Sequence, residues 1–101
     1  MTHAKGGSVY ILTNKNKTTL YTGVTSDLAS RLREHITGVY PKSFAARYNL
    51  KLLVYMEHFS SIEEAIKREK AVKGKTRINK EKLINSVNPK WDDLSEEVLS
   101  W

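Results

Sequence analysis

Two tyrosines, an arginine and a histidine stand near each other in the first third of the chain. Tyr10 and Tyr21 lie in short β-type runs, and Arg31 and His35 follow four residues apart, the spacing of neighbours on a helix. A guanidinium can grip a phosphate with two hydrogen bonds, and an imidazole can move a proton near neutral pH. With two phenols, these groups could act on a phosphodiester. However, a tyrosine pair can simply stabilise a hairpin, and a histidine beside an apolar face is more often structural.

A further candidate is an acidic residue that the helical pattern turns toward the core. Glu69 shares a sector of the helical wheel with three apolar residues, Ile62, Ala65 and Ile66. Because an ionised carboxylate is costly to bury alone, two environments are expected for Glu69. It is either in a salt bridge with a residue such as Arg31 or Arg68, or the ligand of a hard divalent cation such as Mg²⁺. One carboxylate suffices when water and substrate phosphate supply the other ligands.

The basic charge of the chain is concentrated in one segment. The net charge is +6, and residues 67–82, KREKAVKGKTRINKEK, contain eight Lys or Arg and two Glu, so this segment alone accounts for the excess. Such a patch is typical of phosphate-backbone binding, although it can also serve solubility alone or bind other polyanions. Its candidate nucleic-acid contacts are Lys67, Arg68, Lys70, Lys73, Lys75 and Arg77. Residues 91–101 form an acidic C-terminal segment with four acids and no base, which argues against nucleic-acid contact there.

Composition and motif searches exclude several classes of protein. The absence of cysteine rules out disulfide scaffolds, thiolate metal sites and thiol nucleophiles. There is no glycine-rich phosphate loop, no paired-histidine metal spacing and no serine nucleophile elbow. The N-terminus lacks a signal-peptide pattern and no apolar run approaches ~20 residues, so we expect a cytoplasmic protein with no membrane span. At 101 residues, one domain over 1–101 is expected.

Hydrophobic periodicity predicts the elements that must position these groups. Runs at 8–13 and 18–24 predict a hairpin, and a turn centred on Lys15 and Asn16 would place Tyr10 directly opposite Tyr21. The other predicted elements are a helix from 26–27 to Gly38 with an apolar stripe at Leu28, Leu32 and Ile36, a short helix within 43–48, a strand at 52–59, a helix from a capping box at Ser61 to Lys73, and a helix at 79–86. The 52–59 run is apolar on both faces, which favours a central strand. The order of elements predicts an α+β fold, a small antiparallel sheet covered by helices.

Five short motifs occur in order along nearly the whole chain. They are Ser8-Val9-Tyr10 with Asn14, Tyr21-Thr22-Gly23, residues 30–35, residues 65–70, and Asn88-Pro89-Lys90-Trp91. Together they resemble the GIY-YIG endonuclease superfamily, and within it the small single-domain YhbQ-like group related to the N-terminal nuclease module of the ABC excinuclease. Ser8 and Thr22 stand where the family's triplets have Gly and Ile, and Lys75 stands where many small relatives have Trp. Neither triplet position carries a reacting group.

The resemblance implies a three-stranded antiparallel sheet flanked by helices, with one Mg²⁺ or Mn²⁺ ion on Glu69 and hydrolysis by in-line attack of water. The implied roles are a general base or water-orienting group for Tyr10, a hydrogen bond to water or phosphate for Tyr21, charge compensation for Arg31, proton movement for His35, close approach of backbone or substrate at Gly23, and a brace of the site for Asn88. The ordinary pKa of tyrosine is ~10, so a phenolate base would need a nearby cation unless the metal instead acidifies the water.

These observations lead to one main hypothesis and two alternatives. We expect a metal-dependent endonuclease that acts on DNA rather than RNA, is structure-selective, and serves repair or recombination. The first alternative is a non-catalytic nucleic-acid-binding module that uses residues 67–82 as a phosphate grip. The second is an interaction domain that recruits a partner protein through the acidic C-terminal segment and Trp91.

Overall fold

The computed structural model describes residues 6–37 and 44–100. Its strands are β1 (Gly7–Thr13), β2 (Leu20–Thr25) and β3 (Leu52–Phe59), which form an antiparallel sheet in the order β2-β1-β3. Its helices are α1 (Leu28–Thr37), α2 (Phe44–Arg47), α3 (Ile62–Lys73), α4 (Arg77–Val87) and α5 (Ser95–Leu99). The predicted α+β fold, a three-stranded antiparallel sheet flanked by helices, is confirmed.

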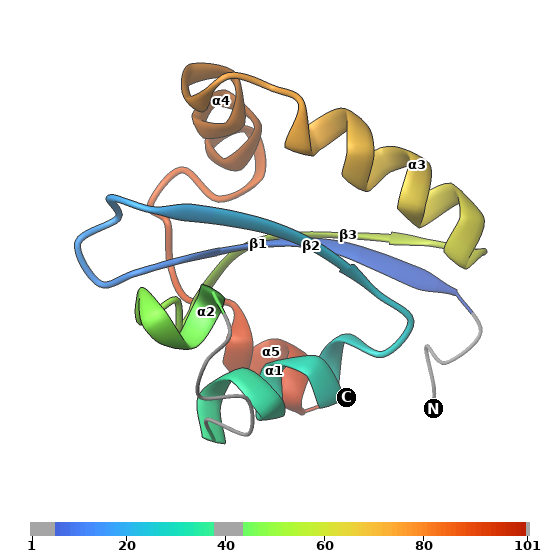
Figure 1. The fold of residues 1–101 in the computed structure, drawn as a ribbon, viewed down its shortest axis with the longest axis horizontal. Helices are drawn as coiled ribbons and strands as arrows, with labels where there is room; N and C mark the ends of the chain where they lie inside the picture. Colours follow the sequence, from blue (N-terminus) through green and yellow to red (C-terminus); the bar gives the residue numbers. More distant parts are fainter. Residues whose placement is uncertain (1–5, 38–43, 101) are drawn as a thin grey trace.

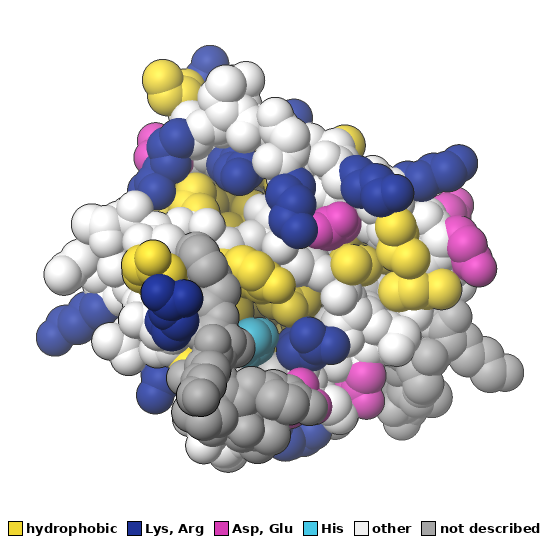
Figure 2. Space-filling model, in the orientation of Figure 1, with side chains coloured by type: hydrophobic (Ala, Val, Ile, Leu, Met, Phe, Trp, Pro, Cys, Tyr) yellow, Lys and Arg dark blue, Asp and Glu magenta, His cyan; other side chains and the backbone are white. Residues whose placement is uncertain are grey.

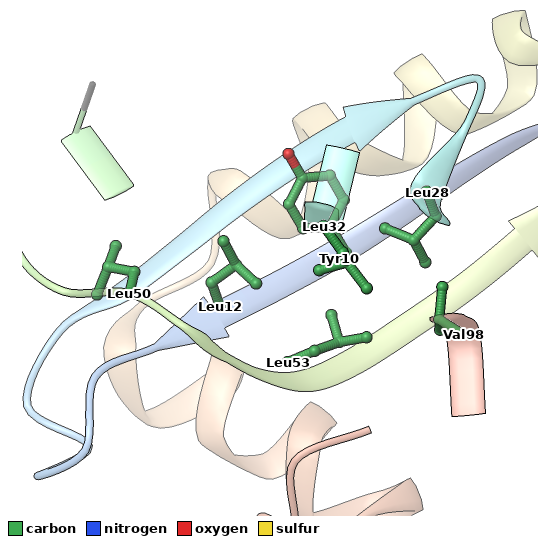
Figure 3. Packing of buried hydrophobic residues seen from close by; sticks show 7 residues of the cluster. All are labelled: Tyr10, Leu12, Leu28, Leu32, Leu50, Leu53 and Val98. Carbon is green, nitrogen blue, oxygen red and sulfur yellow. The ribbon is translucent and has the colours of Figure 1, made fainter. Parts of the chain in front are cut away.

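Helices cover both faces of the sheet (Figure 1), with α3 and α4 on one side and α1, α2 and α5 on the other. The alternation of β1 divides the core accordingly, because successive side chains of a strand point to opposite faces. One buried cluster comprises Tyr10, Leu12, Leu28, Leu32, Leu50, Leu53 and Val98, and the other comprises Ile11, Val54, Tyr55, Val72 and Ile84. Tyr10 is therefore part of the α1 side of the core. In Figure 3 its ring extends across β2, with the hydroxyl oxygen directed away from Leu53 and Val98.

The β1–β2 hairpin forms, but its predicted register is wrong by two residues. Tyr10 pairs with Gly23, and Leu12 pairs with Tyr21. The turn is shifted because the Asn14 side chain organises it: Asn14 Oδ1 accepts hydrogen bonds from the backbone N–H groups of residues 18 and 19, and residue 17 takes a φ of 58°. A shift of two residues leaves each side chain on its predicted face, so both phenols still point to the α1 side.

The prediction that 52–59 is the central strand is also wrong, because β1 is central and β3 lies at an edge. The apolar character of β3 has another cause: helices cover its faces and the C-terminal segment covers its free edge. Leu94 N donates to Leu53 O over 2.7 Å, and Leu53 N donates to Asp93 Oδ1 over 3.0 Å. The side-chain nitrogen of Asn88 donates to Val54 O over 3.0 Å. An edge strand covered in this way can be as apolar as a central one.

The predicted helices are present, with different boundaries at two places. Ser61 caps α3, since its hydroxyl accepts from the backbone N–H of Glu64. The predicted helix at 79–86 begins earlier, at Arg77, because Thr76 caps it. The C-terminal helix α5 was not predicted. On α1 the predicted stripe is incomplete, since Ile36 is 41% exposed; the expected stop at Gly38 lies outside the described residues. No helix in the described ranges has the length and apolar character that crossing a membrane requires.

Candidate functional site

Gly23 is the point where β2 admits the ring of Tyr10. A Cβ atom at Gly23 would lie 2.5 Å from both Cζ and the hydroxyl oxygen of Tyr10. Real Cβ atoms do not approach other atoms so closely, so the absence of a side chain at this position lets the phenol lie across the strand. The close approach that the sequence indicated at Gly23 is therefore made by the chain's own tyrosine.

Three aromatic rings gather between the sheet and α1. The ring centroid of Tyr10 lies 6.4 Å from that of Tyr21 and 6.3 Å from that of His35. Burial, reinforced by Tyr21, raises the pKa of Tyr10 to about 12, against a smaller lowering influence of the Arg31 guanidinium. At neutral pH Tyr10 is consequently a protonated hydrogen-bond donor. The structure thus brings four of the predicted residues into one cluster.

His35 has the properties of a neutral imidazole. Burial lowers its pKa, the neighbouring Arg31 charge lowers it further, and Glu34 opposes both effects. Its Nε2 atom is buried and has no hydrogen-bond partner in the described part of the chain. A buried nitrogen without a partner is unusual in a folded protein. His35 can therefore accept or pass a proton near neutral pH.

Arg31 is held in place by a neighbour on its own helix. Its Nε atom lies 3.3 Å from Glu34 Oε1, and the Arg31 side chain remains 43% exposed. The guanidinium thus lies close enough to act on Tyr10 and is still accessible to a ligand. Sequence reasoning missed Glu34, although its position three residues after Arg31 on a helix is a signal for such an ion pair.

Glu69 is buried, as its place on the helical wheel predicted, with a side chain only 10% exposed. Its Oε2 atom lies 2.9 Å from the Nζ atom of Lys73. The suggested partners Arg31 and Arg68 are wrong, because Arg31 pairs with Glu34 and Arg68 pairs with Glu57. Lys73 is favoured because it lies one helical turn further along the same face.

Lys73 connects the carboxylate to the aromatic cluster. Its pKa is raised first by the hydrogen bond to Glu69 and, more weakly, by Tyr21 on β2. Tyr21 therefore lies near the Lys73–Glu69 pair from the sheet side, while it contacts Tyr10 on the α1 side. The residues assemble around β2, which is an edge strand, with contributions from both layers of helices. Figure 2 shows a histidine, basic groups and acidic groups gathered around an apolar patch on this face.

The donor set around Glu69 suits a hard cation with few protein ligands. No group of three or more His, Cys, Asp or Glu side chains converges within residues 6–37 and 44–100. A multidentate site for a soft metal therefore has no basis there. Glu69 supplies one buried carboxylate that already holds a positive charge, the Lys73 ammonium. Mg²⁺ and Mn²⁺ fit such a site, because they prefer oxygen ligands, and Mg²⁺ typically keeps several waters.

Asn88 lies away from this cluster, at the β3 side of the sheet. Its side-chain nitrogen donates to Val54 O and to Asp92 O, and its side-chain oxygen accepts from Asp92 N. These bonds hold the end of α4 and the following turn against β3. The structure brings Asn88 to a bracing position, but not beside the phenols.

The six basic residues proposed for nucleic-acid contact fall into two groups. Three have protein partners: Lys73 with Glu69, Arg68 with Glu57, and Arg77 with Glu81 and the carbonyls of residues 17 and 18. Of the others, Lys67 and Lys70 are exposed on α3 and Lys75 is half-buried. The basic segment therefore includes structural contacts as well as accessible charge.

Thr22 is a polar residue whose position the sequence did not single out. It pairs with Ile11 on the sheet, so it faces the α3 side, and its hydroxyl oxygen is buried without a hydrogen-bond partner in the described part of the chain. The only signal in the sequence is a threonine where the resembling family has an isoleucine. Thr22 adds a polar atom to the face from which Glu69 approaches.

Comparisons with known proteins agree with the motifs. A family model described as the GIY-YIG catalytic domain matches residues 6–82. A UPF0213 protein of Clostridium perfringens is 39% identical over 90 residues, which cover 89% of this chain and 95% of the relative. A UPF0213 protein of Streptococcus agalactiae is 49% identical over 59 residues, covering 58% and 66%. The solution NMR structure of a UPF0213 protein from Bacillus halodurans has a TM-score of 0.56 and 32% identity, covering 90% of this chain and 95% of that one.

Proposed function

Because this chain belongs to the GIY-YIG catalytic domain family, as its motifs predicted, we propose that it is a divalent-metal-dependent endonuclease that hydrolyses DNA. The observation that carries the proposal is the assembly around β2 of Tyr10, Tyr21, His35 and Arg31 with the Lys73–Glu69 pair. These groups supply a phosphate-binding cation, hydrogen-bond donors, a proton acceptor and a cation ligand.

Proton movement is assigned to His35 rather than to Tyr10. A phenol with a pKa of about 12 is protonated at neutral pH, so Tyr10 orients water or phosphate by donating a hydrogen bond. Burial and Arg31 favour the neutral imidazole of His35, which has an unpartnered nitrogen within the described part of the chain. His35 therefore takes the proton of the attacking water.

Charge compensation is assigned to Arg31 and to the cation site at Glu69. The partly exposed guanidinium of Arg31 can bind a phosphate oxygen and offset the charge that develops during displacement. Glu69 would hold Mg²⁺ or Mn²⁺, which when bound stabilises negative charge on the reacting phosphate and lowers the pKa of water. Lys73 is 59% exposed, so it can leave Glu69 and bind the DNA backbone instead.

The test is cleavage of end-labelled DNA in duplex, flap and branched forms, with a matching RNA arm, in the presence of Mg²⁺ or Mn²⁺. Wild-type protein is expected to cut a branched DNA of the kind that arises in repair or recombination, and chelation of the metal should abolish the product. Glu69→Gln should lose at least about 100-fold in rate, comparable to the loss of one electrostatic catalytic group. Glu63→Gln is the matched control, since Glu63 is an exposed acid on the same helix.

Equal inactivity of wild type and Glu69→Gln on every substrate would refute the catalytic proposal. It would favour the non-catalytic alternative, for which the exposed Lys67 and Lys70 on α3 are the supporting observation. In that case DNA binding without metal should weaken with salt, with a slope on a double-logarithmic plot that reports the number of phosphates neutralised.

A further inference from the structure

A second concave surface lies where the β1–β2 turn meets α4 and the turn after it. It is a groove of about 380 Å³ lined by Lys17, Arg77, Glu81, Lys90 and Trp91. Its volume is within the range of small-ligand sites, and its lining combines three cations, one acid and an indole. We call this surface the Trp91 groove. None of the roles proposed for phosphodiester hydrolysis uses it.

The walls of the groove are fixed by a network around Arg77. Its Nε atom lies 2.6 Å from Glu81 Oε2, and its terminal nitrogens donate to the carbonyls of Lys17 and Thr18 over 2.8 and 3.0 Å. These bonds tie the hairpin turn to the first turns of α4. Arg77 and Glu81 therefore neutralise each other and build the groove, while the lysines at its rim, Lys17 and Lys90, are exposed.

Trp91 is held in the groove by an uncommon backbone conformation. Its φ is 55°, a left-handed value that bulky residues rarely adopt and that costs about 1–2 kcal/mol. Asn88 fixes this turn, because Trp91 N donates to Asn88 O and Asp92 N donates to Asn88 Oδ1. The indole also packs against the second core cluster and donates from Nε1 to Asn85 Oδ1 over 2.6 Å. The ring is thus preorganised, with part of its surface left to line the groove.

An indole beside two exposed lysines matches the chemistry of a nucleotide. Aromatic rings stack on nucleobases, and lysines beside them neutralise the phosphates of the same strand. A base can stack on a protein ring only when it is not stacked in a duplex, so this chemistry selects unpaired strands. An acidic peptide would use the lysines but would have no use for the indole face.

The groove also lies within reach of the proposed cleavage site. Lys17 is four residues before Tyr21, so the two are at most about 14 Å apart along an extended chain. Lys73 and Lys75 belong to the basic segment that leads from α3 to α4. We propose that the Trp91 groove binds an unpaired nucleotide, with its base on Trp91 and its phosphate on Lys17 and Lys90. In its link to cleavage this inference rests on the proposed function; it makes the substrate a DNA with a single-stranded segment beside the cut.

The test measures binding without metal, so that cleavage cannot contribute. The probe is a fluorescein-labelled oligothymidylate of about 16 nucleotides, with a blunt duplex for comparison. Trp91→Leu keeps an apolar side chain and should weaken single-strand binding by about 5- to 150-fold, the range for loss of one stacked base. Duplex binding should change by less than about twofold, because paired bases cannot use the indole. Thermal unfolding monitored by circular dichroism verifies the fold of each variant.

A charge variant tests the lysines without touching the core. Lys17→Asn with Lys90→Gln should reduce the salt slope for the single strand by about 1.4, the value for two phosphate contacts. Asn is chosen at position 17 because it tolerates the φ of 58°. Arg33→Gln with Arg47→Gln is the matched control, since it removes the same charge from exposed positions on α1 and α2. It should leave the slope unchanged.

Fluorescence supplies a direct readout of the ring. In a Trp101→Phe protein Trp91 is the only tryptophan, and saturable quenching by oligothymidylate is expected. The inference is overturned if correctly folded Trp91→Leu and the lysine variant bind single strands as wild type does. It is equally overturned if polyglutamate quenches Trp91 and oligothymidylate does not. DNA cleavage that is unaffected in Trp91→Leu would refute the groove and leave the nuclease, whereas Trp91-dependent binding without cleavage would do the reverse.

Discussion

Replacing Gly23 by alanine is a sharp test of how the site is built. The added Cβ would lie 2.5 Å from Cζ and from the hydroxyl oxygen of Tyr10 and 2.9 Å from Cε1. Tyr10 is only 1% exposed and packs among Leu28, Leu32 and other core residues, so its ring has little room to withdraw. Either the hairpin separates locally or the phenol leaves its place beside Tyr21 and His35.

The expected destabilisation is that of an overpacked core, about 1–3 kcal/mol. For a domain of this size each kcal/mol lowers Tm by about 4–8 °C, so thermal unfolding should resolve the effect. Gly74→Ala is the matched control, because its Cβ would meet Lys70 O at an ordinary 3.5 Å and the backbone φ is −78°. That substitution should be neutral or stabilise the protein by up to about 1 kcal/mol.

A double-mutant cycle identifies the clash as the cause. Tyr10→Leu removes the atoms that the new Cβ would meet, so the double variant with Gly23→Ala should be more stable than the sum of the single effects predicts. The coupling should be at least about 1 kcal/mol, within the range for residues in contact. Urea unfolding at neutral pH measures all four proteins. Additive effects, or a Gly23→Ala protein within about 0.5 kcal/mol of wild type, would refute the reasoning.

Two other predictions concern stability. Asn88→Ala removes the buried amide that bonds to Val54 and Asp92, and it should cost about 2–4 kcal/mol, as measured by urea unfolding; a cost below about 1 kcal/mol would contradict the bracing role. The second concerns alkaline pH, where burial raises the pKa of Tyr10 and of Tyr55 to about 12, whereas unfolded tyrosine titrates near ~10. This stabilisation, about 2–3 kcal/mol for each ring, is fully present below pH ~10 and is lost as pH rises through about 12, so Tyr55→Phe should flatten the decline in unfolding free energy over that interval.

The sequence was sufficient for the elements whose signals are local. Alternating residues predicted the hairpin, and Ser61 with Glu64 marked the start of α3. The burial of Glu69 also followed from helical periodicity alone. These predictions succeed because each depends on residues within one or two turns of each other in the chain.

The errors concern choices that depend on distant or side-chain partners. The register was missed because the side chain of Asn14, rather than backbone symmetry, sets the turn. The strand order was missed because an apolar run can be covered by a C-terminal segment that includes Asp93 and Leu94 as well as by flanking strands. The pairing of Glu69 with Lys73 was missed because the sequence offered several cations, and only the packed helix decides between them.

The candidate site shows the same division. The sequence indicated that Tyr10, Tyr21 and His35 could converge, and the rings do lie together. It could not reveal that Gly23 makes room for one of those rings, since that contact crosses between strands. Nor could it show that Asn88 lies at the other side of the sheet, because a motif does not specify which edge it reaches.

The cover over the free edge of β3 has a practical consequence for where this protein can be cut. The family match ends at residue 82, whereas the bonds to Leu53 and Val54 come from Asn88, Asp93 and Leu94. A fragment trimmed to the matched region would expose a row of unpaired backbone groups, which is a template for self-association. It would also lack the fully buried side chains of Ile84 and Val98. The recognisable module is therefore shorter than the unit that folds, and the final residues act as the sheet's own chaperone against aggregation.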